Sequence, residues 1–173
     1  SYDILNKCLT EEIFDYQGKF YDLKAVSVWP KPLQDPLPIW MPAGSSETIE
    51  FAAERHIPIA RVWNPTVVFQ DAFEYYKEVA KEKFGWDAGP EQCIGSRYIH
   101  VAETTEQAIE ECRKAVMYVR RLSTFSRPVQ VPAPVPGLQT DRSYDYRKRS
   151  KGAEMPGPGT PFEKLRESGF IVC

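Results

Sequence analysis

The sequence predicts an α/β fold built on parallel strands, and three features of the chain indicate it. The run PIWMPAGSSETIEFAAERHIPIARVW, residues 38–63, reads as a strand, a polar turn, a helix and a second strand, which together form a βαβ unit. Two longer helical stretches further along the chain enclose a third strand-like run. Strands that are separated by helices of this length pair in parallel, so these elements predict an α/β architecture.

The composition is that of a globular protein. With 173 residues, 42% of them apolar and 13% aromatic, the chain can bury a core, and we expect one domain. The formal net charge of -2 and the isoelectric point near 5.8 leave no basic surplus, apart from the short basic stretch 142–151. Nucleic acid is therefore not an expected partner.

Cysteine and histidine are too scattered to predict a metal site or a disulfide framework. The four cysteines form no CxxC pair, and the chain has two histidines. No apolar run approaches the roughly 18 residues of a membrane span, and no signal peptide opens the chain. We therefore expect a cytoplasmic protein with reduced thiols, no metal and no membrane partner.

The first predicted elements are a helix and a hairpin. Apolar residues at helical spacing between Tyr2 and Leu9 indicate the helix. Residues 12–26 read as a β-hairpin with its turn at Gln17-Gly18. Four aromatic residues are expected on its arms: Phe14, Tyr16, Phe20 and Tyr21. Residues 29–38 hold four prolines, so we expect an extended connection there that cannot pair fully in a sheet.

Each later element follows from periodicity and end signals. The βαβ unit divides into a strand at Ile39–Pro42, a turn at Ala43–Ser46, a helix at Glu47–His56 and a strand at Ile57–Trp63. Beyond it we expect a helix at Val67–Phe84, a strand at Cys93–Ala102, a helix from a cap at Thr104 or Thr105 to Leu122, a helix at Thr160–Ser168 and a strand at Phe170–Cys173. The chain starts within a helical pattern and stops on an apolar run, so we expect a fragment of a longer protein.

The proline-rich stretch Ser123–Pro161 interrupts this alternation. Its mixed charges and weak periodicity predict a long insertion within the domain rather than a second domain. This insertion has two interpretations. It either covers a ligand pocket, with Tyr144, Tyr146 and Arg147 as contacts, or is a plain surface loop.

The turn between the first strand and helix of the βαβ unit is the main candidate site. In a parallel α/β unit this turn lies at the ligand face, where backbone N–H groups and the helix dipole favour an anion. Gly44 permits close approach, and Ser45, Ser46 and Thr48 add hydroxyl groups. The same residues also fit a plain N-cap, and Glu47 would repel a phosphate unless it points outward.

The turn is not a GxGxxG fingerprint, because it lacks that glycine pattern, and it is not a Walker loop, because it lacks the lysine. The other titratable residues leave their roles open. Arg61 and Asn64 flank Trp63. Strand alternation puts the Arg61 side chain on the same face as Trp63, and the alternative is a solvated or salt-bridged arginine. Arg97, Tyr98 and His100 lie on the next strand, where His100 is either a structural residue or faces the ligand. His56 lies at the C-terminal end of a helix, where it can compensate the helix dipole.

Several segments together resemble the bacterial luciferase-like flavin monooxygenases. They are the hairpin FDYQGKFY, the connector PKPLQDPLPIW, the turn AGSSET, the run FAAERHIPIA, the stretch HVAETTEQA and the closing LRESGFIV. The resemblance implies a (β/α)8 barrel, of which this chain would form the second half, from strand 5 to the start of strand 8. Such barrels have roughly 250 residues, more than this chain has.

The resemblance also implies a flavin site. In this family the turn after strand 5 holds the flavin phosphate, which carries over to Gly44, Ser45, Ser46 and Thr48. Val62 and Trp63 at the end of strand 6 would pack against the isoalloxazine ring; the alternative for Trp63 is a plain core residue. The polar catalytic residues of the family come largely from the first half of the barrel, so no catalytic residue is assigned.

The implied activity is a monooxygenase that uses reduced FMN and O2 on a small organic substrate, with the flavin reduced by a separate reductase. The alternatives are hydride transfer with the deazaflavin coenzyme F420, and a flavin-binding partner subunit without turnover. The full-length protein is expected to form a homo- or heterodimer.

Overall fold

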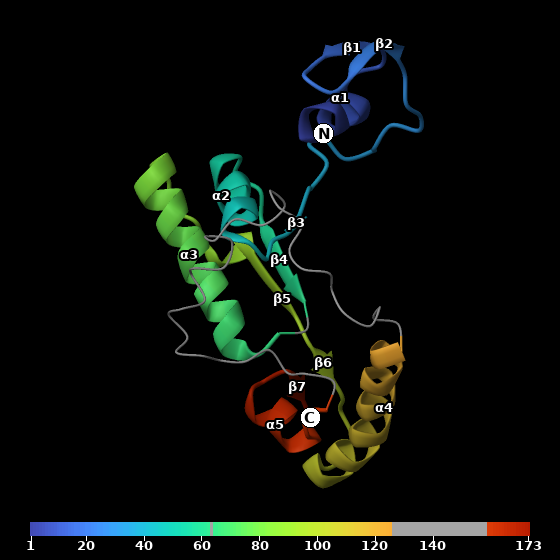
Figure 1. Ribbon diagram of the computed structural model, residues 1–173, viewed down its shortest axis with the longest axis vertical. Helices are drawn as coiled ribbons and strands as arrows, with labels where there is room; N and C mark the ends of the chain where they lie inside the picture. Colours follow the sequence, from blue (N-terminus) through green and yellow to red (C-terminus); the bar gives the residue numbers. More distant parts are fainter. Residues whose placement is uncertain (63, 126–158) are drawn as a thin grey trace. The chain divides into compact units, whose positions relative to one another are not determined.

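The computed structural model describes residues 1–62, 64–125 and 159–173, with side chains in the third long helix described to Leu122. The chain divides into two compact units, Ser1–Ile39 and Trp40–Cys173. Figure 1 labels their elements, the first unit in blue and the second from cyan to red.

The first unit holds helix α1 (Tyr2–Thr10) and an antiparallel hairpin of β1 (Phe14–Gln17) and β2 (Asp22–Val26). A bulge between Phe14 and Tyr16 shifts the register, and the Ala25 N–H donates to the Asp15 carboxylate at 2.8 Å. The hairpin is therefore confirmed.

The placement of two hairpin aromatics on the arms was wrong. Phe20 and Tyr21 lie in the loop between the strands, which is closed by the Gly18 N–H donating to the Tyr21 carbonyl at 2.8 Å. The first strand ends at Gln17 and the second begins at Asp22, so the loop has four residues, from Gly18 to Tyr21. Both aromatic side chains are exposed as a result, whereas Phe14 on the first arm is buried.

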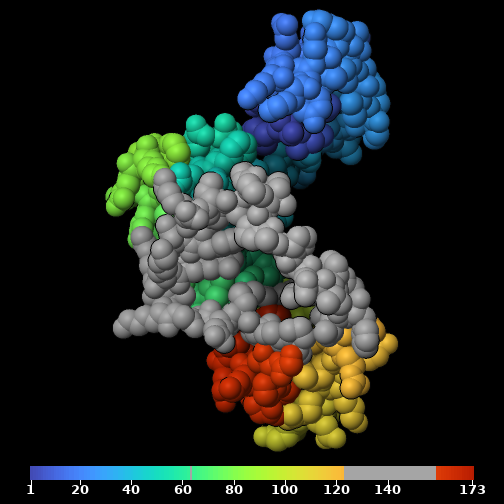
Figure 2. Space-filling model, viewed as in Figure 1, coloured from blue at the N-terminus to red at the C-terminus, as the bar shows by residue number. Residues whose placement is uncertain are grey.

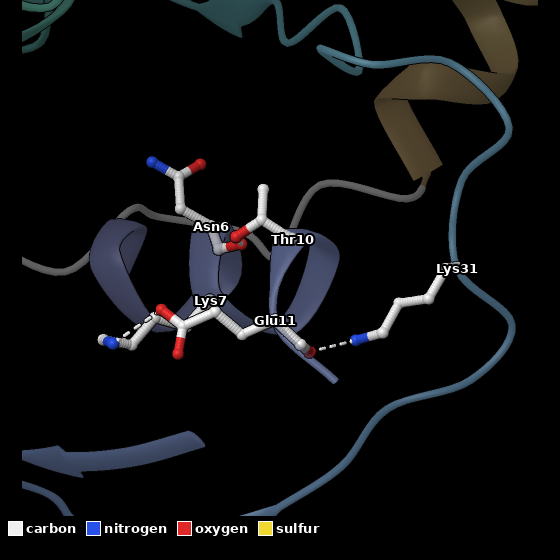
Figure 3. A network of polar contacts seen from close by, with 5 residues as sticks. All are labelled: Asn6, Lys7, Thr10, Glu11 and Lys31. Atoms are coloured by element: carbon white, nitrogen blue, oxygen red, sulfur yellow. Dashed lines mark hydrogen bonds and ion pairs between the residues drawn. The ribbon is translucent and has the colours of Figure 1, made fainter. Parts of the chain in front are cut away.

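The proline-rich connection returns to the end of α1, where Figure 3 shows Lys31 beside the last turn. The Lys31 ammonium donates to the backbone carbonyls of Cys8 at 2.8 Å and Glu11 at 2.5 Å. The last carbonyls of a helix have no partner within it, and its dipole attracts a cation there. Lys31 thus caps the helix and ties the connection to it.

The second unit is built on parallel strands, as the sequence predicts. Strand β4 (Ile59–Val62) pairs on one side with β3 (Met41–Pro42) and on the other with β5 (Cys93–Ser96). The short strand β6 (Tyr98–Ile99) pairs in parallel with β7 (Ile171–Val172). The predicted single strand over 93–102 is thus two strands separated by Arg97, because β5 pairs with β4 and β6 with β7. Closure of these strands into a barrel stays a prediction.

Helices α2 (Ser46–Glu54) and α3 (Thr66–Phe84) pack against each other beside the β3–β4–β5 sheet (Figure 1). A core of Ile49, Ile59 and Tyr76 lies between them and the strands. The Tyr76 hydroxyl donates to the Ile57 carbonyl at 2.9 Å, and burial raises the pKa of Tyr76 to about 12. The short 3-10 helix η1 (Pro90–Gln92) leads from α3 into β5.

The C-terminal elements form a second cluster. Helix α4 (Thr105–Phe125) packs through Cys112 and Val116 against Phe162 and Leu165 of α5 (Phe162–Glu167). Figure 2 shows the C-terminal residues, in red, directly against α4, in yellow to orange. Gly169 joins α5 to β7 with φ +71°, and a Cβ there would lie 2.1 Å from Thr66 Oγ1, so only glycine fits.

The described strands bury one face and expose the other at their ends. Ile59 and Ile171 are buried, whereas Val62, Ile99 and Val172 are exposed. Side chains alternate between the two faces of a strand, so the exposed set marks the face opposite the packed helices. Among the described helices, none has the length and apolar character that crossing a membrane requires.

Candidate phosphate site at the start of helix α2

The turn that follows β3 ends in a capped helix. Ser45 is the N-cap of α2, with extended backbone angles of φ -101° and ψ 157°. Its Oγ accepts the Thr48 N–H at 3.3 Å and lies 3.1 Å from Thr48 Oγ1. Of the two residues that fit a cap in the sequence, Ser45 fills the position, because its backbone is extended and its side chain accepts the Thr48 N–H.

This cap is compatible with anion binding. The two hydroxyl groups of Ser45 and Thr48 carry two hydrogens, and their mutual hydrogen bond uses one of them. The other hydrogen can be donated to a ligand. Ser46 is 4% exposed, so its side chain lies inside the fold, whereas the Glu47 side chain is exposed. The repulsion that Glu47 would exert on a phosphate is thereby reduced.

The turn and the end of β4 lie at the same edge of the sheet. Pro42 pairs with Ala60, and the Ala43 N–H donates to the Ala60 carbonyl at 3.2 Å. Residues that follow β3 and β4 are therefore neighbours, as the carboxyl ends of parallel strands must be. Val62, assigned by resemblance to the flavin ring, ends β4 and is 51% exposed. Trp63 lies outside the described residues.

Gly44 is not required by the backbone of the turn. Its φ lies outside the positive region, and a Cβ there would meet only Arg61 Nη1, at an ordinary contact distance of 3.5 Å. Alanine would thus fit the turn as it stands. The absent side chain leaves the surface of the turn open, which is what close approach of a ligand requires.

Arg61 is the residue whose position sequence reasoning missed. It is 5% exposed, and its Nη1 donates to the Ala43 carbonyl at 2.7 Å, with Nη2 3.4 Å from Asn64 Oδ1. Asn64 is held in turn by donating to the Val62 carbonyl at 2.5 Å. The alternative of a solvated Arg61 is wrong, because the side chain is buried against the turn. The only signal of this position in the sequence is an arginine within an apolar strand.

Arg97, Tyr98 and His100, which the sequence puts on the next strand, make their described contacts away from this turn. The Arg97 guanidinium lies 5.1 Å from the ring centroid of Phe69, and the Tyr98 ring lies 5.8 Å from that of Phe170. His100 Nε2 lies 2.8 Å from the Glu111 carboxylate on α4. These contacts favour structural roles.

The contacts of the two histidines, at α4 and after the end of α2, also favour structural roles. The hydrogen bond from His100 is the main cause that lowers the pKa of the Glu111 carboxyl. His56 follows the C-terminal end of α2, as predicted, and its ring stacks on Trp86 with centroids 4.2 Å apart. Tyr144, Tyr146 and Arg147 lie outside the described residues. Within the described ranges, no three His, Cys, Asp or Glu side chains are grouped as metal ligands would be.

One solved structure supports the fold, and a second is similar to the chain over nearly its whole length. Monooxygenase RslO1 from Streptomyces bottropensis matches 71% of this chain with a TM-score of 0.58 at 21% identity, over 39% of its own length. The oxygenating constituent of 3,6-diketocamphane monooxygenase from Pseudomonas putida, a type II Baeyer-Villiger monooxygenase in complex with FMN, matches 99% of this chain at 17% identity and a TM-score of 0.49, over 53% of its length. The chain thus spans about two-fifths and one-half of these proteins.

No curated protein matches the sequence significantly. The sequence profile of the luciferase-like monooxygenases, in contrast, matches residues 1–161, which is nearly the whole chain. That match covers the hairpin, the turn, the end of β4 and α4 in one continuous stretch. The chain therefore belongs to the luciferase-like monooxygenase family.

Proposed function

We propose that the protein is a flavin-dependent monooxygenase that binds FMN by its phosphate at the turn before α2. The observation that carries the proposal is a capped helix N-terminus at the carboxyl edge of a parallel sheet, with a buried arginine beside it, in a chain of this family. Helix N-termini attract anions through their dipole and their N–H groups.

The donors at the turn fit a phosphate. The mutual contact of the Ser45 and Thr48 hydroxyls uses one of their two hydrogens and leaves the other for a ligand, and Arg61 on β4 contacts the turn through the Ala43 carbonyl. Gly44 presents no side chain that would hold a ligand away. The chemistry of the donor set is therefore that of an anion site, with hydroxyl, backbone and guanidinium groups from two neighbouring strand ends.

Bound FMN, once reduced, would supply the electrons that activate O2. The residues of this chain would bind and orient it: Ser45 and Thr48 at the phosphate, and Val62 and Trp63 along the ring. We propose a small organic substrate and a separate reductase that supplies the reduced flavin. The groups that act on the substrate are not assigned to this chain.

Flavin titration tests the proposal. The double variant Ser45→Ala/Thr48→Ala should lose roughly 2–4 kcal/mol of FMN binding, because each hydroxyl can donate a charge-assisted hydrogen bond of about 1.5–3 kcal/mol once their mutual hydrogen bond opens, and the two bonds are not fully additive. That corresponds to roughly 30- to 700-fold in the dissociation constant. The control is Thr104→Ala, which removes a similar hydroxyl that accepts the Gln107 N–H at the start of α4. Equal FMN affinity of the double variant and the wild type would contradict the site.

Two further measurements separate the alternative functions. A parallel titration with F420 tests the deazaflavin alternative, which predicts tighter binding of F420 than of FMN. Oxygen consumption in the presence of reduced FMN, with product analysis over a panel of small organic compounds, tests catalysis. Flavin binding without any substrate-dependent product would favour the partner subunit without turnover.

A further inference from the structure

Two of the four cysteines meet in the core cluster of the C-terminal elements. Cys112 belongs to the buried face of α4 and is 4% exposed, and Cys173 packs against the same cluster. Side chains alternate along a strand, so Cys173, two residues after Ile171 of β7, extends the face that Ile171 buries in the cluster. Two elements that are far apart in the sequence thus bring two thiols together.

The two thiols also interact with each other. Burial is the main cause that raises the pKa of Cys112 to about 11, and a hydrogen bond with the Cys173 side chain adds to it. A hydrogen bond raises the pKa of the group whose proton it uses, so the Cys112 S–H donates and the Cys173 sulfur accepts. Both cysteines are free in the structure, so the contact joins two reduced thiols.

The surroundings of the two thiols differ. Cys112 is enclosed by the cluster, whereas Cys173 is half-buried. Cys173 also lines a cavity of about 500 Å³, together with Arg166 and Glu167 of α5 and Val172 of β7. A small oxidant can therefore reach Cys173 through the cavity, whereas Cys112 is reached only through Cys173. Reactive cysteines are partly exposed, and enclosed ones are inert unless a neighbour is modified first.

We propose that Cys173 is an oxidation site and that Cys112 is its resolving thiol, so that a peroxide converts the pair into a disulfide between α4 and the end of β7. This inference goes beyond the proposed function and does not require bound flavin.

The reaction has two steps. The Cys173 sulfur loses its proton and attacks one oxygen of hydrogen peroxide; the O–O bond breaks, the other oxygen leaves as water, and Cys173 becomes a sulfenic acid. The Cys112 sulfur then loses its proton and attacks the Cys173 sulfur; the S–O bond breaks, a second water leaves, and the S–S bond forms. The two thiols lose two electrons, which the peroxide takes up. A dithiol reductant reverses the reaction and is itself oxidised to a disulfide.

The disulfide changes the stability of the fold. It closes a loop of roughly 60 residues, and a cross-link across a loop of that length stabilises mainly by restricting the unfolded chain. We therefore expect peroxide treatment to raise the thermal midpoint of the full-length protein by roughly 5–10 °C. Reduction with dithiothreitol should return the midpoint to its original value.

Peptide mapping of the full-length wild type tests the pair directly. The reduced protein is treated with hydrogen peroxide, its remaining thiols are blocked, and it is digested with trypsin without reductant. We expect the peptide Tyr98–Arg113, which contains Cys112, to be linked to the peptide that begins at Glu167 and contains Cys173. Reduction should separate the two peptides. Absence of this link, at a peroxide concentration that oxidises free cysteine in a parallel sample, would overturn the inference.

Three variants test the order of the two steps. Cys112→Ala removes the resolving thiol, so oxidation should stop at the Cys173 sulfenic acid, which dimedone traps as a covalent adduct. Cys173→Ala should leave the enclosed Cys112 unmodified. The matched control is Cys8→Ser in the first unit, which should keep both the link and the rise of the thermal midpoint.

Ordinary core cysteines predict a different pattern. They would give no dimedone adduct on Cys173 in the Cys112→Ala variant, and a rise of the midpoint as large in Cys173→Ala as in the wild type would mean that the pair is not its cause. Either result overturns the inference. The peptide map of the wild type decides it even where a variant does not fold.

Discussion

Replacing Ser45 by aspartate separates its two roles, the helix cap and the phosphate contact. Aspartate caps helices about as well as serine, so its carboxylate can accept the Thr48 N–H that Ser45 Oγ now accepts at 3.3 Å. The folded state should therefore keep its stability to within about 0.5 kcal/mol. A carboxylate at the same position would repel a phosphate and withdraw a hydroxyl donor from it.

The magnitude follows from the contact that is lost and the repulsion that is added. Loss of one hydrogen bond to a charged group costs about 1.5–3 kcal/mol. Repulsion between two unit charges 4 Å apart adds up to about 4 kcal/mol at an effective dielectric constant of 20. FMN binding should therefore weaken by at least about tenfold from the lost hydrogen bond alone, and by more with the repulsion, since each 1.4 kcal/mol is a factor of ten.

The assay pairs urea unfolding with FMN titration on the full-length protein. Thr104→Asp is the matched control, because Thr104 Oγ1 accepts the Gln107 N–H at 3.2 Å at the start of another helix. That variant should leave both stability and FMN affinity unchanged. Wild-type FMN affinity in a stable Ser45→Asp variant would refute the assignment of the phosphate to this turn.

Three further predictions concern stability and the flavin ring. Tyr76→Phe removes the donor to the buried Ile57 carbonyl and should cost about 1–2 kcal/mol in urea unfolding; an unchanged unfolding midpoint would contradict this. The pKa of Glu111 is lowered by His100 from its usual 4.5, so its stabilising effect is present above that value and is lost as the pH falls through the lowered pKa. Glu111→Gln should therefore flatten the fall of the thermal midpoint below about pH 4.5, and a fall as steep as that of the wild type would argue against it. Trp63→Leu should weaken flavin binding by roughly 1–2 kcal/mol with a modest loss of apo stability if Trp63 faces the ring, whereas a large stability loss with unchanged flavin affinity would make it a core residue.

The alternation of strands and helices was predictable because it rests on periodicity, which each segment carries by itself. The helix Thr66–Phe84 and the capped start of α2 follow from such local signals. The break at Arg97 was not predictable in this way. It depends on which strands lie on either side, since β5 pairs with β4 and β6 with β7.

The candidate site was predictable only in part for the same reason. Ser45 and Thr48 are three residues apart, so their contact follows from helix geometry. Arg61 and Ala43 are brought together by the pairing of β3 with β4, and the sequence shows only an arginine in an apolar strand. Strand alternation places Arg61 on one face but does not say whether that face is buried.

The most direct test of the central claim is a structure of the full-length protein with FMN bound. The account predicts that a phosphate oxygen lies within hydrogen-bonding distance of the Ser45 or Thr48 hydroxyl, with Arg61 still donating to the Ala43 carbonyl. The claim would be contradicted by FMN bound elsewhere, with its phosphate distant from the residues 43–48.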